Sequence, residues 1–297
     1  MRVTPELQLR RRFFAEELEA VAKLRSSRLV DAFAAVPRER FLPPGPWTVL
    51  SDSADSYMLG AAARTRTTSD DDPARVYHNI AVAIDPARQL FNGQPATLGV
   101  WIDALDLAPG KRVLHIGAGL GYYTAVMAQC VGEDGRVVAY EVDNALAGTA
   151  QRNLAPYGNV ALRHGNASGE LDGPFDAILV NAGVTHPLDT WLDAMTPGAR
   201  MTLPITATMA MMGTTLGKGV VVIVTAGADG ELAARIVTVV VVYSAEGVRD
   251  PAMNDAIGEA LMAGPARWQA VNRLRRDAHE PAASCWLHRD SCCFSAM

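Results

Sequence analysis

The chain has 297 residues, 49% of them hydrophobic, and a formal net charge of −5. This suits one large domain with an extension and a sizeable packed core. The negative charge argues against a nucleic-acid binder, which normally carries a basic face. No apolar run is long and unbroken enough to span a membrane. The N-terminus reads as a charged helix rather than an export signal, so we expect a cytosolic protein.

The first ninety residues predict helices and loops. Apolar side chains recur at three- and four-residue steps over residues 5–24, which is typical of an amphipathic helix. A second short helix is expected before Pro37, with Ser26 or Ser27 as its N-cap. Residues 64–75 carry almost no apolar side chains, and we expect a solvated loop there that can be disordered. We assign residues 1–90 to an N-terminal segment of helices and loops.

From about residue 95, predicted helices alternate with predicted strands. This alternation is typical of a parallel sheet with helices on both faces. We expect helices over 97–107, 121–131, 143–155 and 187–195, and strands over 112–116, 136–141, 159–163, 176–181 and 199–204.

The last part of the sheet predicts a hairpin. Two long strand-like runs, 219–227 and 234–244, flank a turn at 228–230 and indicate an antiparallel pair at one edge. The expected fold class is therefore α/β, with a doubly wound, mostly parallel, seven-stranded Rossmann-like sheet over residues 91–247. Residues 248–297 are expected to form a C-terminal extension, helical over 250–277, and a tail.

The stretch VLHIGAGLGYYTA (113–125) combines a short strand, a turn with three glycines and the start of a helix. Gly117, Gly119 and Gly121 follow a GxGxG spacing. A dinucleotide fingerprint, GxGxxG, would place its third glycine at Tyr122, and a P-loop would need a Gly-Lys-Ser/Thr sequence. The turn therefore lets a ligand approach the backbone closely but lacks the pattern of a pyrophosphate site.

Polar residues follow the neighbouring predicted strands. Glu141 ends the next strand, where an acid can accept hydrogen bonds from both hydroxyls of a ribose. Asn166 and Ala167 lie in the loop after the third strand and can reach an adenine edge, and Asn181 ends the strand DAILVN. Together these residues describe a site for a nucleoside with an amino-acid tail and no phosphate, which is S-adenosylmethionine.

At these residues the chain resembles the class I S-adenosylmethionine-dependent methyltransferases, and among them the protein-L-isoaspartate O-methyltransferase family. Three further segments carry the resemblance: LVDAFAAVPRERFLP (29–43), FNGQPAT (91–97) and DAMTPGARMTLPI (193–205). It covers roughly residues 26–245. It implies that Gln94–Thr97 surrounds an acceptor carboxylate, with Thr97 where the family has Ser and Gly99 where a proline is usual. The expected cofactor-binding residues are Gln94, Ala96, Ile116, Gly117, Gly119, Gly121, Tyr122, Glu141, Val142, Asn166, Ala167 and Asn181.

The candidate catalytic residues are Thr97, Asn181 and His186. A carboxylate acceptor needs no general base, whereas a phenol or amine would benefit from one. His186 is either that base, near the expected methyl group, or an exposed loop residue. His78 is a weaker candidate for the acceptor side. His115 stands where many methyltransferases have an acid that orders the glycine turn, and a satisfied buried histidine is the alternative. Met209, Met211 and Met212 fill the core or line the acceptor pocket.

The leading hypothesis is a methyltransferase acting on an oxygen, expected to be a carboxylate, of a peptide or small molecule. The alternatives are true isoaspartyl repair, a base-assisted phenol or amine methyltransferase, an inactive cofactor-binding scaffold, and a nucleotide-dependent oxidoreductase. The sequence indicates neither the acceptor nor the oligomeric state.

Three of the four cysteines lie in the last thirteen residues, near His288. Disulfides are not expected without an export signal. A zinc site built from Cys285, His288, Cys292 and Cys293 lacks the paired CxxC spacing. We therefore expect reduced thiols and no metal.

Overall fold

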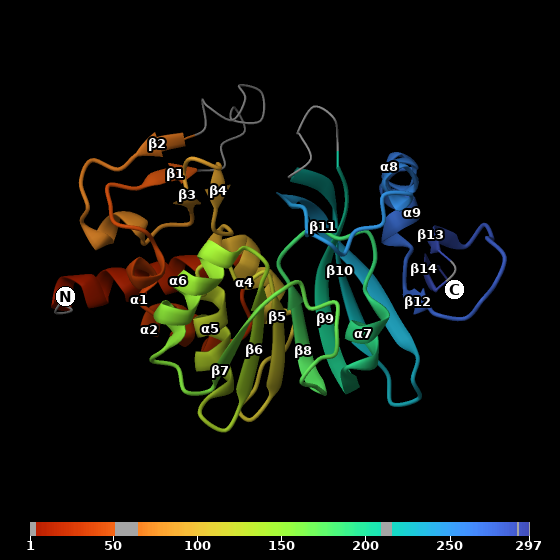
Figure 1. Cartoon of the computed structure of the whole chain (residues 1–297), viewed down its shortest axis with the longest axis horizontal. Helices are drawn as coiled ribbons and strands as arrows, with labels where there is room; N and C mark the ends of the chain where they lie inside the picture. The colour runs from red at the N-terminus through yellow and green to blue at the C-terminus, as the bar shows by residue number, and fades with distance from the viewer. Residues whose placement is uncertain (1–3, 51–64, 209–215, 290, 297) are drawn as a thin grey trace.

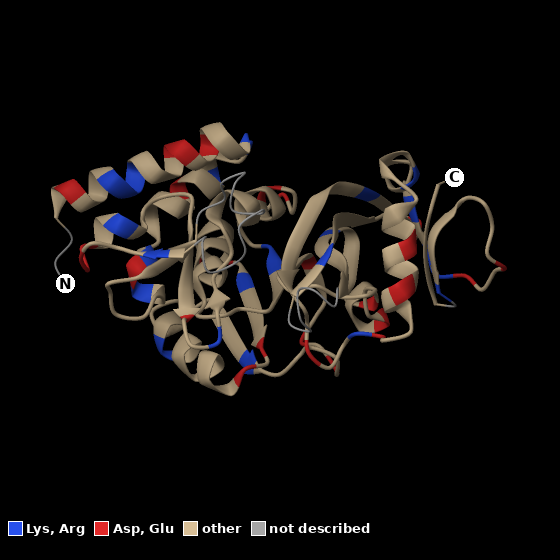
Figure 2. Ribbon diagram, turned by 90° about the horizontal axis from the view of Figure 1, so that it is seen from above, with Lys and Arg blue, Asp and Glu red and all other residues tan. Residues whose placement is uncertain are grey.

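The computed structural model describes residues 4–50, 65–208, 216–289 and 291–296. Their strands form two sheets, one of ten strands and one of four. The large sheet runs through the middle of the molecule, and the two ends of the chain lie at opposite ends of it (Figures 1 and 2). Figure 2 also shows that acidic and basic residues both lie along the helix nearest the N-terminus.

The large sheet has the order β13-β14-β12-β11-β10-β9-β8-β5-β6-β7. Five neighbouring strands are parallel, and β10 and β11 are antiparallel to their neighbours. The predicted α/β fold and the hairpin of 219–244 are confirmed. The five parallel strands are β5 (Arg112–Ile116), β6 (Arg136–Glu141), β7 (Val160–His164), β8 (Phe175–Val180) and β9 (Met195–Thr208), and the antiparallel pair is β10 (Leu216–Ala226) and β11 (Leu232–Tyr243).

Helices cover both faces of this sheet, as expected for a doubly wound fold. Apolar side chains of α4 (Pro95–Asp103), α5 (Tyr122–Val131) and α6 (Asn144–Leu154) share one core cluster with α1 and α2. Those of α7 (Asp189–Asp193) and α8 (Met253–Met262) belong to a second cluster on the other face. Val113 and Leu114 illustrate the division, because successive side chains of a strand point to opposite faces. No helix among the described residues is both long and apolar enough to cross a bilayer.

The prediction that residues 1–90 form only helices and loops is wrong. Helices α1 (Pro5–Ala22) and α2 (Ser27–Ala35) are present, and the Ser26 hydroxyl accepts a hydrogen bond from the Leu29 amide at 3.2 Å, as a capping residue. They are followed by the short helix η1 (Arg38–Phe41) and a four-stranded sheet. Its strands are β1 (Thr48–Leu50), β2 (Thr65–Thr67), β3 (Ala81–Asp85) and β4 (Leu90–Phe91).

Part of the predicted solvated loop is therefore ordered. Residues 65–67 pair with β1, and η3 (Pro73–Val76) follows. The Thr68 side chain is buried and accepts a hydrogen bond from the Trp47 amide at 2.9 Å. Backbone pairing and a buried hydroxyl do not need apolar side chains, so composition alone misses them.

The C-terminal predictions need two corrections. The helix expected over 250–277 consists of α8 and α9 (Pro265–Gln269), because Gly264 and Pro265 interrupt it. Residues 273–275 form strand β12 instead, which pairs with β11. With β13 (Cys285–Arg289) and β14 (Cys292–Ser295), it extends the sheet to ten strands rather than seven. The hairpin β10–β11 is consequently not at the edge.

Candidate functional site

The predicted site residues lie at the carboxyl ends of four neighbouring strands. Gly117 follows β5, Val142 follows β6, Gly165 follows β7 and Asn181 follows β8. These four strands are parallel, so their carboxyl ends lie together. The Asn181 amide donates to the Ile116 carbonyl at 2.8 Å, and its side-chain Nδ2 to the Gly117 carbonyl at 3.3 Å. The structure thus brings the expected cofactor-binding elements together.

The glycine turn has a backbone that requires glycine. Gly117 has φ +85° and Gly121 has φ +95°, in the region that other residues rarely adopt. A Cβ on Gly117 would lie 3.2 Å from the Asn181 carbonyl oxygen, and one on Gly121 would lie 2.9 Å from the Leu154 side chain. Gly121 is the residue before α5, so the turn leads directly into that helix.

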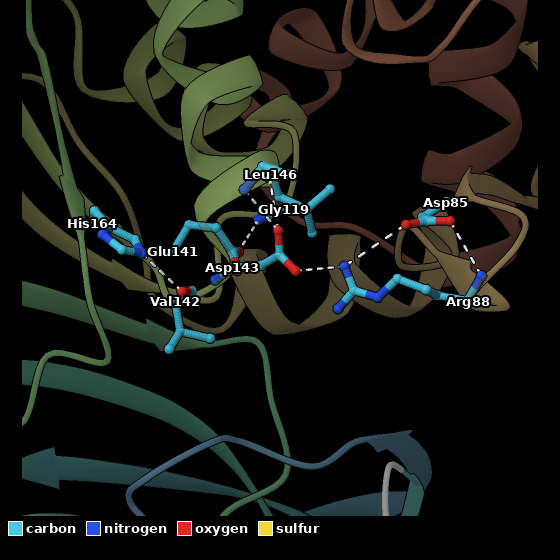
Figure 3. Close-up of polar contacts among 9 residues, drawn as sticks. Asp85, Arg88, Gly119, Glu141, Val142, Asp143, Leu146 and His164 are labelled. Carbon is cyan, nitrogen blue, oxygen red and sulfur yellow. Dashed lines mark hydrogen bonds and ion pairs between the residues drawn. The ribbon is translucent and has the colours of Figure 1, made fainter.

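Glu141 is buried at this edge, with 6% of its surface exposed. Its Oε2 accepts a hydrogen bond from the Gly119 amide at 2.6 Å, and its Oε1 accepts one from the Asp143 amide at 3.0 Å (Figure 3). Burial, more than any other effect, raises the pKa of this carboxyl, and the two amide hydrogen bonds counteract it. The carboxylate therefore orders the glycine turn from the neighbouring strand.

His115 does not order the turn. It is completely buried, its Nδ1 lies 2.8 Å from the Thr124 hydroxyl, and burial lowers its pKa to about 3. The alternative, a satisfied buried histidine, is correct for burial and for Nδ1, whereas the buried Nε2 has no hydrogen-bond partner among the described residues. The contact with the glycine turn that was considered for His115 is made by Glu141 instead.

An ion pair connects the N-terminal segment to the end of β6. Arg88, after β3, lies 2.5 Å from the Asp143 carboxylate and 3.7 Å from that of Asp85 (Figure 3). Asp143 also caps α6 by accepting hydrogen bonds from the Ala145 and Leu146 amides. Hydrogen bonding to the Leu146 amide is the main cause that lowers the pKa of Asp143. Sequence reasoning missed Arg88 because nothing local marks its distant partner.

Asn166 and Ala167, the residues predicted to contact the adenine, already make hydrogen bonds within the protein. The Asn166 side-chain oxygen accepts hydrogen bonds from the amide and hydroxyl of Ser168 at 3.2 and 2.7 Å. Its Nδ2 faces the Glu246 carbonyl at 3.5 Å. Ala167 is buried, and its carbonyl accepts a hydrogen bond from Trp191 Nε1 at 2.7 Å. Tyr122 points its ring into the N-terminal core, against Phe33 and Phe41, so only its backbone faces the turn.

The segment 91–97 lies beside the glycine turn. The Tyr123 hydroxyl, on the first turn of α5, donates to the Gly93 carbonyl. The Tyr243 hydroxyl, at the end of β11, accepts from the Phe91 amide at 3.1 Å. The segment is therefore held between α5 and the end of β11, next to the strand ends.

Asn79 fixes the first turn of α4, which is the expected acceptor segment. Its Oδ1 accepts a hydrogen bond from the Ala96 amide at 2.8 Å, and its carbonyl accepts one from Gln94 Nε2 at 3.2 Å. The Thr97 hydroxyl donates to Gln94 Oε1 at 3.3 Å. The first amides of a helix carry partial positive charge, which suits a carboxylate. Pro95 has no N–H and the Ala96 amide is bonded to Asn79, so Thr97 supplies the donors of this turn for an acceptor.

A buried arginine supports Asn79 from behind. Arg38 is fully buried and donates to the carbonyls of Val76, His78 and Ile80 at 2.5, 3.0 and 2.6 Å. These carbonyls flank Asn79 on both sides in the chain. The segment VPRERF, noted from sequence only for its resemblance, thus contributes a scaffold for the acceptor segment.

Neither histidine candidate makes a described side-chain contact with the glycine turn or with residues 91–97. His186 is 7% exposed, so its interpretation as an exposed loop residue is wrong. Its Nδ1 lies 2.9 Å from the Thr185 hydroxyl, which in turn accepts from the Asp250 amide of the C-terminal extension. His78 has an exposed side chain and contributes only its carbonyl to Arg38. Residues 209, 211 and 212, predicted as core or pocket wall, fall outside the described residues.

Comparison with known proteins identifies one family. A family model described as Protein-L-isoaspartate(D-aspartate) O-methyltransferase (PCMT) matches residues 58–223, more than half of the chain. The protein-L-isoaspartate O-methyltransferase of Methanopyrus kandleri is 29% identical over 195 residues, covering 64% of this chain and 74% of the relative. The protein-L-isoaspartate O-methyltransferase 1 of Rhodopseudomonas palustris is 34% identical over 203 residues, covering 67% and 69%.

A solved structure shares the fold. It comes from Plasmodium falciparum and is described as a PCMT in complex with S-adenosyl-L-homocysteine. It matches with a TM-score of 0.58 and 17% identity, covering 80% of this chain and 98% of that chain.

Proposed function

The chain belongs to the protein-L-isoaspartate O-methyltransferase family of S-adenosylmethionine-dependent enzymes, and we propose that it methylates the carboxylate of an isoaspartyl residue in a peptide. The resemblance predicted from the sequence is confirmed. The arrangement that best supports the proposal is the position of the Gln94–Thr97 turn. It lies beside the glycine turn, held there through Gly93 and Tyr123. Residence in the cytosol stays a prediction.

The residues at the strand ends fit S-adenosylmethionine. Each Glu141 oxygen already accepts one amide hydrogen bond, and a carboxylate can accept about four in total, so capacity is left for two ribose hydroxyls. The close approach of Gly117 to Asn181 leaves no room for a side chain at the turn. The proposed cofactor-binding residues include neither Lys nor Arg, which fits a ligand without phosphate. Arg88, nearby, is paired with Asp143.

We assign the remaining contacts by position. The Asn181 side chain is proposed to meet the amino-acid tail, and Val142, 37% exposed after Glu141, to contact the adenine. Asn166 would have to exchange its contacts with Ser168 and Glu246 to bind adenine through its side chain. Ile116, Gln94, Ala96, Tyr122 and Ala167 are proposed to contribute backbone or apolar contacts.

The chemistry makes few demands on the protein. When bound, S-adenosylmethionine supplies a methyl group on a sulfonium, which is a good leaving group. An acceptor carboxylate is ionised at neutral pH, so no proton has to be removed. The protein's task is to hold the carboxylate in line and exclude water. We propose that the Thr97 amide and the Thr97 hydroxyl, which exchanges its hydrogen bond to Gln94 for one to the acceptor, hold the carboxylate, and that Asn79 keeps this turn in place through the Ala96 amide.

His186 is not needed as a base for this acceptor. Burial, as the largest effect, lowers its pKa, and its described hydrogen bond is to the adjacent Thr185. Its proposed role is structural, at the junction with the C-terminal extension.

The test is methyl transfer to two synthetic peptides that differ only in an isoaspartyl or aspartyl linkage. Release of S-adenosylhomocysteine with the isoaspartyl peptide alone supports the proposal. Equal transfer to both peptides would indicate a different carboxylate acceptor. Calorimetry with S-adenosylmethionine separates a third outcome, because absence of binding would leave only a scaffold function.

A further inference from the structure

Four side chains of the C-terminal extension come together far from the glycine turn. They are His279 in the loop after β12, Cys285 and His288 on β13, and Cys293 on β14. Each offers one donor atom, and the four atoms lie within 4.8 Å of one another. We infer that these four residues bind one structural Zn²⁺ ion.

The distances are close to those of a tetrahedral site. Zinc bonds of about 2.0 Å to nitrogen and 2.3 Å to sulfur place the ligand atoms about 3.3–3.8 Å apart. Cys285 Sγ and His279 Nε2 are already 3.7 Å apart. The His279 and His288 rings meet edge to face, with centroids 4.8 Å apart. Side-chain movements of about 1 Å would complete the tetrahedron.

The backbone places these groups on one side of a hairpin. His288 is paired directly with Cys293 across β13 and β14. The neighbouring Cys292 points to the opposite side, where it is buried in the same core cluster as Trp286 and Phe294. Successive residues of a strand face opposite ways, so only one of the two adjacent cysteines can join the site.

The surrounding contacts are those expected around metal ligands. His279 Nδ1 lies 2.8 Å from the Asp277 carbonyl, which orients the ring with Nε2 toward Cys285. The Ala282 amide donates to Cys285 Sγ at 3.3 Å, as it would to a thiolate. His288 Nδ1 is buried and has no hydrogen-bond partner among the described residues. An unsatisfied buried nitrogen is costly unless the ring has another role.

The donor set selects zinc. Two thiolates and two imidazoles suit Zn²⁺, whereas Ca²⁺ and Mg²⁺ require oxygen ligands. Four protein ligands leave no open coordination position, which is typical of a structural rather than a catalytic site. The cluster also lies at the end of the sheet near β13, beyond β10 and β11 from β5 and β6 (Figure 1).

The ion would fasten the C-terminal extension to the sheet edge. It would tie the loop of residues 276–284 to the β13–β14 hairpin, whose other face is anchored by Trp286 and Phe294. The spacing of the proposed ligands is H-x5-C-x2-H-x4-C, which contains no CxxC pair, so the CxxC pattern does not indicate a site here. The set considered from the sequence included Cys292 and omitted His279.

The first test is the zinc content of the purified full chain, measured by plasma mass spectrometry after gel filtration. We expect about one zinc per chain. Zinc should be lost in Cys293→Ser and His279→Ala, and kept in Cys292→Ala, the matched control one residue away. Zinc retained in both ligand variants, or a disulfide between Cys285 and Cys293 in the native protein, would overturn the inference.

A second measurement does not depend on the variants folding. Exchange of the wild-type chain with Co²⁺ should produce the strong visible absorption of tetrahedral cobalt with a thiolate charge-transfer band. A chelator should lower the melting temperature of the wild-type chain, because the metal binds only the folded state. Absence of both effects in protein prepared with zinc would also overturn the inference.

Discussion

The amide of Gly119 donates a 2.6 Å hydrogen bond to the buried carboxylate of Glu141, on the neighbouring strand. One side chain thereby fixes the glycine turn and remains at the strand edge where the ribose is proposed to bind. The conformation of the glycine turn and the proposed binding of the ribose thus depend on the same carboxylate.

Replacing Glu141 should weaken cofactor binding. Glu141→Gln keeps the size but removes the charge from hydrogen bonds worth about 1.5–3 kcal/mol each. We expect the Kd for S-adenosylmethionine to rise about 10- to 100-fold, measured by calorimetry. The exposed Glu170→Gln is the control for the same chemical change and should bind normally. Unchanged affinity in Glu141→Gln would remove the basis of the proposed site.

Cofactor affinity should also depend on pH through this carboxyl. Burial raises the pKa of Glu141 above its usual 4.5 in the folded protein. A raised pKa means that the folded state takes up the proton first as pH falls. The ionised form that accepts from the ribose is therefore lost at a pH above 4.5, and affinity should drop there.

The same shift has a defined effect on stability. Between 4.5 and the raised pKa the folded state holds more protons than the unfolded state, so this group's contribution to stability decreases as pH rises through that window. Calorimetric titration with S-adenosylmethionine at several pH values across the window checks the predicted loss of affinity. The Kd of Glu141→Gln should not change with pH there. A wild-type profile as flat as that of the variant would contradict the prediction.

Local patterns predicted that the glycine turn and Glu141 lie side by side at the carboxyl ends of neighbouring strands. Strand ends, glycine spacing and Glu141 are encoded within short stretches, and the parallel topology then brings them together. The support of the acceptor segment was not predictable in this way. Arg38 reaches the carbonyls of Val76 and Ile80 some forty residues away, and no periodicity marks such a contact. The strands at the C-terminus were missed because they are short and find their partners only in the folded chain, where β12 pairs with β11, β14 with β12 and β13 with β14.

Two glycines offer a matched test of backbone strain. Gly121 has φ +95° and would place a Cβ 2.9 Å from Leu154, whereas Gly148 lies exposed within α6 with open space around it. Gly121→Ala should destabilise the chain by about 1–3 kcal/mol, and Gly148→Ala should stabilise it by about 0.5–1 kcal/mol. Urea unfolding measures both. Equal effects of the two substitutions would contradict the strained turn.

The buried Arg38 should be essential for the N-terminal segment. Arg38→Met would leave three carbonyl groups without their donor in a buried site, so we expect a loss of about 3–5 kcal/mol. Arg28→Met, at an exposed position on α2, should change stability by less than about 0.5 kcal/mol. Urea unfolding of both variants distinguishes a scaffold role from a surface charge. A loss as small as that of Arg28→Met would show that other groups satisfy these carbonyls.

Asn79 should act as a positioning residue for the acceptor. Its Oδ1 holds the Ala96 amide in the first turn of α4, and no described contact joins it to the glycine turn. Asn79→Ala should therefore raise the KM for the isoaspartyl peptide about tenfold, as expected for one lost hydrogen bond, while the Kd for S-adenosylmethionine stays unchanged. Asn79→Asp keeps the acceptor oxygen but adds a negative charge beside the proposed carboxylate site, so it should raise the peptide KM at least as much as Asn79→Ala does.

The control for Asn79 is a second asparagine that ties the backbone elsewhere. Asn159 donates to the carbonyls of Ala128 and Gly132. It directly precedes β7 and therefore lies at the amino ends of the parallel strands, away from the carboxyl ends that carry the site. Asn159→Ala should reduce stability without changing either constant, because the acceptor turn does not depend on it. If both alanine variants raised the peptide KM equally, the effect would be general loosening of the fold. The role of Asn79 in orienting Gln94 and Thr97 would then have to be abandoned.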